Sequence, residues 1–197
     1  MQALPEIEAA IQLIGDQYSP LSPHCAADLK QCARLLHLDK GTLLVREGQL
    51  SNKTYFVVTG CARAFYLKSG KDITDWFAFE HAFVSAIHSF FLNAPSQHFI
   101  ELLEPARLLE ISRESIARLS DKHHDFERLG RIIVTKTMLQ LQQRIVSIQF
   151  EPAQQKYDNL LAIRPDITQR VPLTHIASYL GITLETLSRI RNPKNRI

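Results

Sequence analysis

Apolar residues recur at helical spacing near the start of the chain. They lie three or four positions apart and predict an amphipathic helix over residues 4–14, on Leu4, Ile7, Ile11 and Ile14. Ser22 followed by Pro23 is typical of a helix start, because serine caps the first turn and proline lacks an N–H that has no partner there. The sequence therefore predicts a second helix from this point to about Arg34.

From Leu35 onward the apolar residues fall in short segments rich in β-branched and aromatic side chains. Turn signals such as Thr59-Gly60 and the run Lys-Ser-Gly-Lys at 68–71 separate them. Many short strands at this kind of spacing favour an antiparallel barrel or sandwich. The predicted strands are 43–46, 54–58, 62–67, 73–79 and 98–111, and they are followed by a helix from the cap residue Ser112 to Leu119.

Residues 123–150 have the longest helical pattern, with neither glycine nor proline after Gly130. The apolar residues alternate at spacings of four and three and form a narrow seam, made by Val134, Met138, Leu141, Ile145 and Ile148. A narrow seam on a long helix favours contact with a second copy of the chain. The alternative is that the seam packs on the protein's own barrel.

Pro152 ends this helix, and a second pattern follows near the C-terminus. Residues 173–191 predict two short helices joined by a glycine-containing turn, which is the pattern of a helix-turn-helix. Gly181 can adopt the positive φ that the turn requires, and Thr183 can cap the second helix. The first helix is predicted to bury Ile176, Ala177 and Leu180, and the second to bury Leu184, Leu187 and Ile190.

The second of these helices would present polar side chains to solvent, at Glu185, Thr186, Ser188, Arg189 and Arg191. In a helix-turn-helix, the N-terminal residues of this helix face bases in the major groove. Arginine can bind guanine O6 and N7 together, and a carboxylate can accept a hydrogen bond from cytosine N4. The pattern favours DNA binding, and an ordinary helical hairpin with a solvated basic face is the alternative.

The net charge of the chain is concentrated at one end. Residues 1–150 hold 16 basic and 16 acidic residues, whereas residues 151–197 hold seven basic and four acidic residues. The whole excess of three positive charges therefore lies in the last part of the chain. A basic segment beside a neutral one favours an acidic partner such as nucleic acid.

Composition excludes several classes of protein. The chain is 45% hydrophobic and 22% charged, which is typical of a globular protein. No apolar run reaches the roughly 18–20 residues of a membrane-spanning helix, and the start has no basic patch followed by an apolar block. Three cysteines without a CxxC pair favour reduced thiols. We therefore expect a soluble cytoplasmic protein that does not interact with membranes.

A β-roll, a long helix and a C-terminal helix-turn-helix in this order resemble the Crp/Fnr family of bacterial transcription regulators. The strongest local match is Gly-Ile-Thr-Leu-Glu-Thr-Leu-Ser-Arg at 181–189, which is close to the family's G-x-[ST]-x-E-T-[ILV]-[GS]-R. Residues 40–48, 55–60 and 108–112 resemble parts of its β-roll. The resemblance implies an α+β fold with an N-terminal antiparallel, jelly-roll-like β-roll and flanking helices. Its parts would be a sensor β-roll related to cyclic nucleotide-binding domains (1–120), a dimerisation helix (121–150) and a DNA-binding helix-turn-helix domain (151–197).

The resemblance also implies a function and its residues. The protein would be a homodimeric, sequence-specific regulator without enzymatic activity, with a double-stranded DNA operator and RNA polymerase as partners. By this resemblance Glu185 and Arg189 read bases and Ser188 lies against a base or a phosphate. Thr174 and Thr183 would contact the DNA backbone.

The match departs from the family at two places in the DNA-binding segment. Leu184 stands where catabolite-activator-type members carry an arginine, so the helix is more similar to the Fnr-type subgroup. The chain stops six residues after Arg191, which leaves no room for the full two-stranded wing of the family. We expect Lys194 and Arg196 to supply phosphate contacts in its place.

The residues of the expected ligand pocket differ from the family's pattern more than the DNA-binding segment does. Cyclic nucleotide-binding members carry a G-E-L turn, whose carboxylate binds the ribose, and an R-[ST]-A segment, whose arginine binds the phosphate. Aligned without gaps, these positions hold Ser85, Ala86 and Ile87 and then Ser96, Gln97 and His98. A cyclic phosphate without a cation loses its main charge-assisted hydrogen bonds. The sequence therefore predicts that cAMP does not bind, that the effector is a different one or absent, and that no cofactor is held.

The cysteines and histidines show no metal-ligand spacing. Cys25 and Cys32 lie seven positions apart and do not make the cysteine cluster of an iron–sulfur centre, so we expect buried helix residues. We expect the histidines to be solvated or hydrogen-bonded and not to bind a metal. They are His81, His88, His98, His123 and His124. Two interpretations of the aromatic residues stay open: they line an apolar ligand cavity, or they form the core of the roll. These residues are Trp76, Phe77, Phe79, Phe83, Phe90 and Phe91.

Two alternatives to a DNA-binding regulator stay open. A small-molecule-binding β-barrel or cupin-like metalloenzyme would need a metal triad such as H-x-H with a distant histidine, which the histidine spacing does not provide. The other alternative is a dimeric scaffold that keeps the roll and the long helix but has lost DNA binding.

Overall fold

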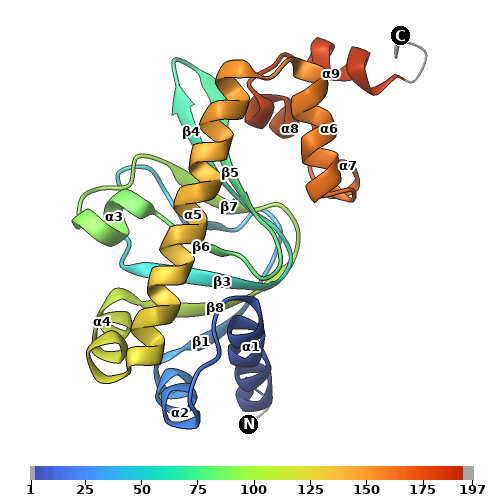
Figure 1. Cartoon of the computed structure of the whole chain (residues 1–197). Helices are drawn as coiled ribbons and strands as arrows, with labels where there is room; N and C mark the ends of the chain where they lie inside the picture. Colours follow the sequence, from blue (N-terminus) through green and yellow to red (C-terminus); the bar gives the residue numbers. More distant parts are fainter. Residues whose placement is uncertain (1–2, 193–197) are drawn as a thin grey trace.

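The computed structural model describes residues 3–192, which form a β-roll, one long helix and a small helical head made of α6 to α9 (Figure 1). The strands are β1 (Arg34–Leu38), β2 (Leu43–Val45), β3 (Lys53–Thr59), β4 (Ala62–Lys68), β5 (Lys71–Ala78), β6 (Phe83–Ser85), β7 (Phe99–Leu102) and β8 (Ala106–Ser112). The helices are α1 (Ala3–Gln17), α2 (Pro23–Cys32), α3 (Ile87–Leu92), α4 (Arg113–Lys122), α5 (His124–Phe150), α6 (Ala153–Ile163), α7 (Ile167–Arg170), α8 (Leu173–Leu180) and α9 (Leu184–Arg191).

The β-roll consists of two antiparallel four-stranded sheets. One has the strand order β1-β8-β3-β6 and the other β2-β7-β4-β5. Buried residues from both sheets form one core, among them Val45, Val57, Ala64, Ile100 and Leu108. The predicted α+β class with an antiparallel β-roll is confirmed.

The N-terminal helices cover one sheet, together with α4 and the first turns of α5. Their apolar faces pack on Phe56, Leu109 and Ile111 of the sheet. The predicted caps are present, because Ser22 accepts a hydrogen bond from the Cys25 N–H and Ser112 accepts one from the Ser115 N–H. The second helix ends at Cys32, earlier than predicted, because Arg34 already belongs to β1.

The prediction for residues 34–112 was wrong in four places. The elements β1, β6 and α3 were not predicted, and the segment 98–111 is two strands, β7 and β8. Both missed strands and the missed helix are short, with three to six residues in each. A segment of this length has too few apolar positions to show a period, so packing decides its structure.

The long helix α5 runs along the β-roll from α4 to the head (Figure 1). Its first turns are buried at Phe126 and Leu129, but the predicted seam is not. Among the seam residues, Leu141 is half-buried and four are exposed, namely Val134, Met138, Ile145 and Ile148. The seam therefore does not pack on the chain's own β-roll. Within residues 3–192, no helix is both long enough and apolar enough to cross a membrane.

Candidate nucleic-acid interface and its attachment to the β-roll

The predicted helix-turn-helix is formed by α8 and α9. Gly181 between them has φ +67°, and its N–H donates to the Ser178 carbonyl. The Thr183 side chain caps α9 by accepting a hydrogen bond from the Thr186 N–H at 3.2 Å. Buried apolar residues of both helices pack in the core of the head, namely Ile176, Ala177, Leu180 and Leu187. Local sequence signals thus determine this motif, as the sequence predicts.

The polar side chains predicted to contact DNA lie on the outside of this motif. Thr186 is half-buried, and its hydroxyl lies 3.2 Å from that of Thr183. Lys194 and Arg196 lie outside the described residues. The remaining candidates are all exposed, namely Thr174, Thr183, Glu185, Ser188, Arg189 and Arg191.

Leu184 corrects the prediction of which apolar residues of α9 are buried. It is 41% exposed, whereas Leu187 is fully buried and Ile190 half-buried. Leu184 is the first residue of α9 and lies next to the exposed Glu185. Its side chain therefore belongs to the exposed face of the motif and not to its core.

The head is attached to the β-roll through α8, which lies against β5, the last strand of its sheet. The Thr74 N–H donates to the Ser178 hydroxyl at 2.9 Å, and this hydroxyl donates to the Asp72 carbonyl at 3.1 Å. Arg144 of α5 donates to the Thr74 carbonyl at 3.2 Å and to the Tyr179 carbonyl at 2.7 Å. Side chains of α8 and α5 thus pair with backbone groups that an edge strand otherwise leaves to solvent.

Arg63 of β4 is a buried cation between this sheet and the head. Its side chain is only 2% exposed, and its guanidinium donates to the carboxylates of Asp72 and Glu101. It also donates to Nδ1 of His175 in α8 at 2.8 Å, since an arginine cannot accept. Burial, and then the charge of Arg63, lower the pKa of His175. The neutral imidazole is therefore the form that accepts this hydrogen bond.

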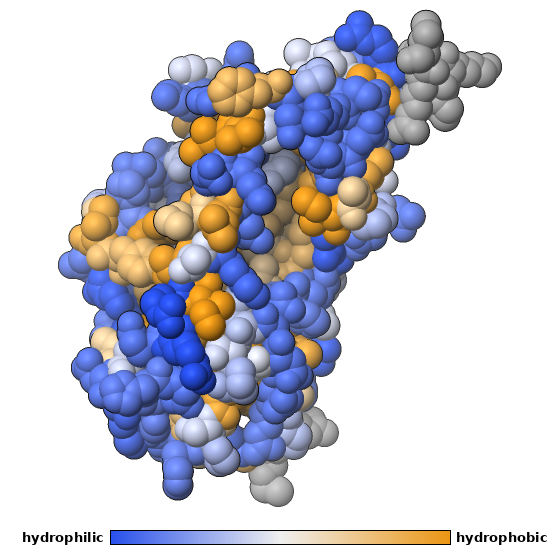
Figure 2. All heavy atoms as spheres, in the orientation of Figure 1, coloured by the Kyte–Doolittle hydropathy of each residue, from blue (hydrophilic) through white to orange (hydrophobic). Residues whose placement is uncertain are grey.

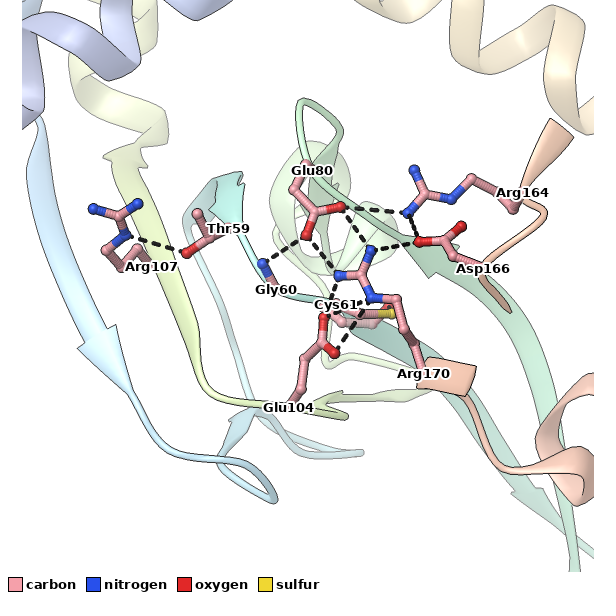
Figure 3. A network of polar contacts seen from close by, with 10 residues as sticks. Thr59, Gly60, Cys61, Glu80, Glu104, Arg107, Arg164, Asp166 and Arg170 are labelled. Carbon is pink, nitrogen blue, oxygen red and sulfur yellow. Dashed lines mark hydrogen bonds and ion pairs between the residues drawn. The ribbon is translucent and has the colours of Figure 1, made fainter. Parts of the chain in front are cut away.

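A second polar contact between roll and head is centred on Arg170 of α7 (Figure 3). Its guanidinium donates two hydrogen bonds to Glu80, at 2.6 and 3.0 Å, and also bonds Glu104. Glu80 follows β5 and Glu104 precedes β8, so both carboxylates come from loops of the roll. Within the head, Asp166 accepts from Arg170 and from Arg164.

Glu80 is held in its charged form by these contacts. Burial opposes its charge, but hydrogen bonds from Arg170 and from the N–H groups of Glu80 and Gly60 outweigh burial and lower the pKa of Glu80 to about 2. Gly60 is required for this approach, because it has φ +104° and a Cβ there would lie 2.7 Å from the Cβ of Ala106.

Sequence reasoning did not single out Arg63, Glu80 or Arg170. Arg63 carried a usable signal, because it lies between the buried residues Ala62 and Ala64 of a strand, and a buried charge needs a partner. The contact between Glu80 and Arg170 had no local signal, since 90 positions separate the two residues.

The first three positions predicted for a nucleotide pocket lie at the junction of β6 and α3. Ser85 ends β6 and is half-buried, Ala86 is buried, and Ile87 is 47% exposed. None of these side chains carries a charge or a carboxylate that could bind a ribose hydroxyl.

The second three positions precede β7 and are engaged with one another. The Ser96 hydroxyl donates to the His98 carbonyl at 2.7 Å and accepts from the His98 N–H at 3.3 Å. Gln97 is exposed. His98 is buried, its Nε2 has no hydrogen-bond partner within the described chain, and burial lowers its pKa. The neutral imidazole is therefore the favoured form of His98 at this predicted pocket position.

A cavity of about 1000 Å³ lies elsewhere, between α5, the end of β5 and α6. Four of the six aromatic residues line it, namely Trp76, Phe77, Phe79 and Phe83. On α3, Phe90 is buried and Phe91 is 60% exposed. The aromatic residues therefore do not form one group.

The histidines and cysteines do not form one group, since Cys61 packs with residues of the head and His175 belongs to α8. His123 bonds the Asp28 carboxylate through Nε2 at 2.7 Å, and His81 stacks on Phe56. His88 and His124 are exposed. All three cysteines are free, with Cys25 and Cys61 buried and Cys32 half-buried.

Comparison with known proteins finds both a domain family and a fold. Residues 35–123 match the family described as cyclic nucleotide-binding domain. No curated protein matches the chain by sequence. Several solved structures of bacterial regulators share its fold.

FixK2 from Bradyrhizobium japonicum is 18% identical with a TM-score of 0.68, over 80% of this chain and 82% of that one. The global regulator CLP from Xanthomonas campestris, described as c-di-GMP responsive, is 15% identical with a TM-score of 0.66, over 86% and 89%. The catabolite activator protein from Thermus thermophilus is 17% identical with a TM-score of 0.55, over 86% and 82%.

Proposed function

We propose that the chain is a sequence-specific DNA-binding transcription regulator of the Crp/Fnr type, without enzymatic activity; its residues 35–123 match the cyclic nucleotide-binding domain model, and it shares its fold with solved regulators. The observation that carries the proposal is the exposed face of α9. A capped helix presents Glu185, Ser188 and Arg189 to solvent beside a buried partner helix. These side chains are suited to base edges in a major groove.

The protein acts in this proposal as a homodimer joined along α5. Four of the five seam residues are largely accessible to solvent, since Val134, Met138, Ile145 and Ile148 are 55%, 59%, 55% and 45% exposed. Figure 2 shows apolar side chains gathered along α5 and over α3 on the same face. A second copy covering this helix would remove a large apolar surface from water, which is a strong drive for association. The two recognition helices would then reach successive major grooves about 34–36 Å apart.

The proposed regulator does not respond to cAMP. Ser85 and His98 supply neither the carboxylate nor the cation that would bind a cyclic ribose phosphate, and the pKa of His98 is lowered by burial. An unpaired phosphate charge at this place would be poorly solvated. Any effector must instead act by favouring one position of the heads over another.

A selection of bound duplexes from a random DNA pool tests this function. The wild-type protein should enrich a two-fold symmetric site, and Arg189→Ala should lose preference at one base pair in each half-site. Arg46→Ala is the matched control, since this exposed arginine lies on the β-roll and not on the head. If Arg189→Ala kept both the affinity and the preference of the wild type, α9 would not be the recognition helix.

The dimer is tested separately by sedimentation. Ile145→Asp places a charge in the seam and should convert the dimer to a monomer, with loss of operator affinity. Gln143→Asp, at an exposed position outside the seam, should leave the dimer intact. A wild-type chain that sediments as a monomer at all concentrations would contradict this part of the proposal.

A further inference from the structure

Three side chains of metal-binding types meet at the base of the β-roll, away from the head. Cys25 lies in α2, His123 lies at the junction of α4 and α5, and Asp125 lies in the first turn of α5. One ligand atom of each, taken from the thiol, the imidazole and the carboxylate, lies within 4.8 Å of the other two. Sulfur, nitrogen and oxygen ligands at such distances can converge on a single ion.

The three side chains are held in place by the surrounding structure. Cys25 is fully buried in the core below α2. Asp125 accepts hydrogen bonds from the Ser22 N–H at 2.5 Å and from the Phe126 N–H at 3.1 Å. Little side-chain freedom remains to be lost on binding an ion, which favours affinity.

His123 has the second contact that is usual for a metal-binding histidine. Its Nε2 lies 2.7 Å from the Asp28 carboxylate, and its side chain is only 11% exposed. A carboxylate that accepts from one ring nitrogen fixes the orientation of the ring and leaves the other nitrogen to bind a metal. Asp28 is therefore a positioning residue for His123.

We propose that Cys25, His123 and Asp125 form a binding site for a zinc ion. Zinc binds thiolate, imidazole and carboxylate ligands together, whereas calcium and magnesium require oxygen ligands. Binding replaces the proton of the Cys25 thiol, which is released to solvent, by a bond between zinc and sulfur. Water would be the fourth ligand, as in other zinc sites with three protein ligands, and it can enter from the solvent-open pocket that His123 and Asp125 line.

The zinc ion would connect α2 to the start of the long helix. Cys25 belongs to α2 and Asp125 to α5, and the ion would add to the hydrogen bond from Ser22 to Asp125, which spans 103 positions of sequence, and to the bond between His123 and Asp28. An ion that binds only the folded chain stabilises it by mass action. The site is thus placed to strengthen the base from which the proposed dimer helix extends, independently of DNA binding.

The test is metal binding by the purified full-length chain. Titration of the metal-free protein with zinc should show one ion per chain and a raised midpoint of thermal unfolding. Cobalt used in place of zinc should give the intense near-ultraviolet absorption of a bond between cobalt and a thiolate. Absence of one-to-one zinc binding, or cobalt binding without this absorption, would overturn the proposal.

Variants locate the site. His123→Gln and Asp125→Asn should each abolish one-to-one binding and the cobalt–thiolate absorption, and Asp28→Asn should weaken binding roughly 10–100-fold. Cys25→Ala should remove the absorption as well, and His123→Gln keeps the test valid if loss of the buried Cys25 disturbs folding. His124→Gln and Cys61→Ala are the matched controls, and both should bind zinc as the wild type does. Binding that survives His123→Gln, or that is lost in either control, would place the metal elsewhere and refute the assignment.

Discussion

Two groups of arginines, in the head and at its contact with the β-roll, have completely different surroundings. Arg189 and Arg191 lie exposed on α9, on a helix whose cap and apolar face are encoded within a few residues. Arg170 lies between the head and the roll, where it bonds Glu80 and Glu104, and Arg63 lies below α8 with only 2% of its side chain exposed. The same residue type therefore serves two purposes, a surface for an acidic partner and an internal attachment.

The basic residues after position 150, whose excess charge first indicated a nucleic-acid partner, therefore fall into two sets. Of the seven cations after residue 150, Arg164 and Arg170 bind carboxylates within the protein, and Lys156 is buried with its amine on the Ile148 carbonyl. Among the described residues, Arg189 and Arg191 remain on the exposed surface of α9. Counting charge along a sequence overstates what a partner can reach, because internal carboxylates neutralise part of it.

Replacing a buried arginine should have the largest effect on stability. Arg63→Ala leaves Asp72 and Glu101 without their cation, and because these carboxylates are 39% and 21% exposed the loss in the free energy of unfolding should fall below the value of about 3–5 kcal/mol for a fully buried pair. Urea unfolding measures this loss. Arg189→Ala should change the same quantity by less than about 0.5 kcal/mol, as is usual for surface substitutions. Similar losses in both variants would remove the distinction between the two groups.

Acid should weaken the attachment of the head through Glu80. Its pKa is about 2 in the folded protein and has an ordinary value of 4.5, so the stabilisation is complete above pH 4.5 and is lost as the pH falls toward 2. The shift corresponds to about 2–3 kcal/mol, allowing for the partial exposure of the side chain. Unfolding measured across this range should show the loss in the wild type and a smaller slope in Glu80→Gln. Identical slopes would mean that Glu80 is not held as described.

For the exposed arginines of α9 we expect that a substitution weakens DNA recognition and leaves the stability of the fold unchanged. Arg189→Ala should cost about 1–3 kcal/mol of operator affinity, concentrated at one base pair. Binding measured on a set of single-base operator variants detects this change. A uniform loss over all sequences would instead assign Arg189 to a phosphate.

The smallest effect is expected for Lys194→Ala, which tests the predicted phosphate contact. Affinity should fall slightly and equally on every sequence, and the slope of log affinity against log salt should decrease by about one unit. Binding measured at several salt concentrations gives this slope. An unchanged slope would show that Lys194 does not contact the DNA backbone.

Local signals explain which parts of the fold could be predicted. Ser22, Ser112 and Thr183 cap helices at the predicted places, because a capping side chain bonds an N–H only two or three residues away. The six-residue helix α3 has Ile87 and Phe91 largely exposed, so its apolar residues indicated no buried face. Leu184 was predicted to be buried but is exposed. Periodicity shows which residues share a helix face, but it does not show how far along that face the neighbouring helix makes contact.

The sequence by itself determined the two short helices with their glycine turn and cap, and the long helix with its apolar seam. Each of these follows from neighbouring residues, whose spacing sets which side chains share a face. Only the tertiary structure decided that Arg170 binds Glu80 and that Cys25 meets His123. Those contacts join residues about a hundred positions apart, and the choice of partner depends on how the two sheets and the helices pack. Charge and ligand type are properties of a residue, whereas pairing is a property of the fold.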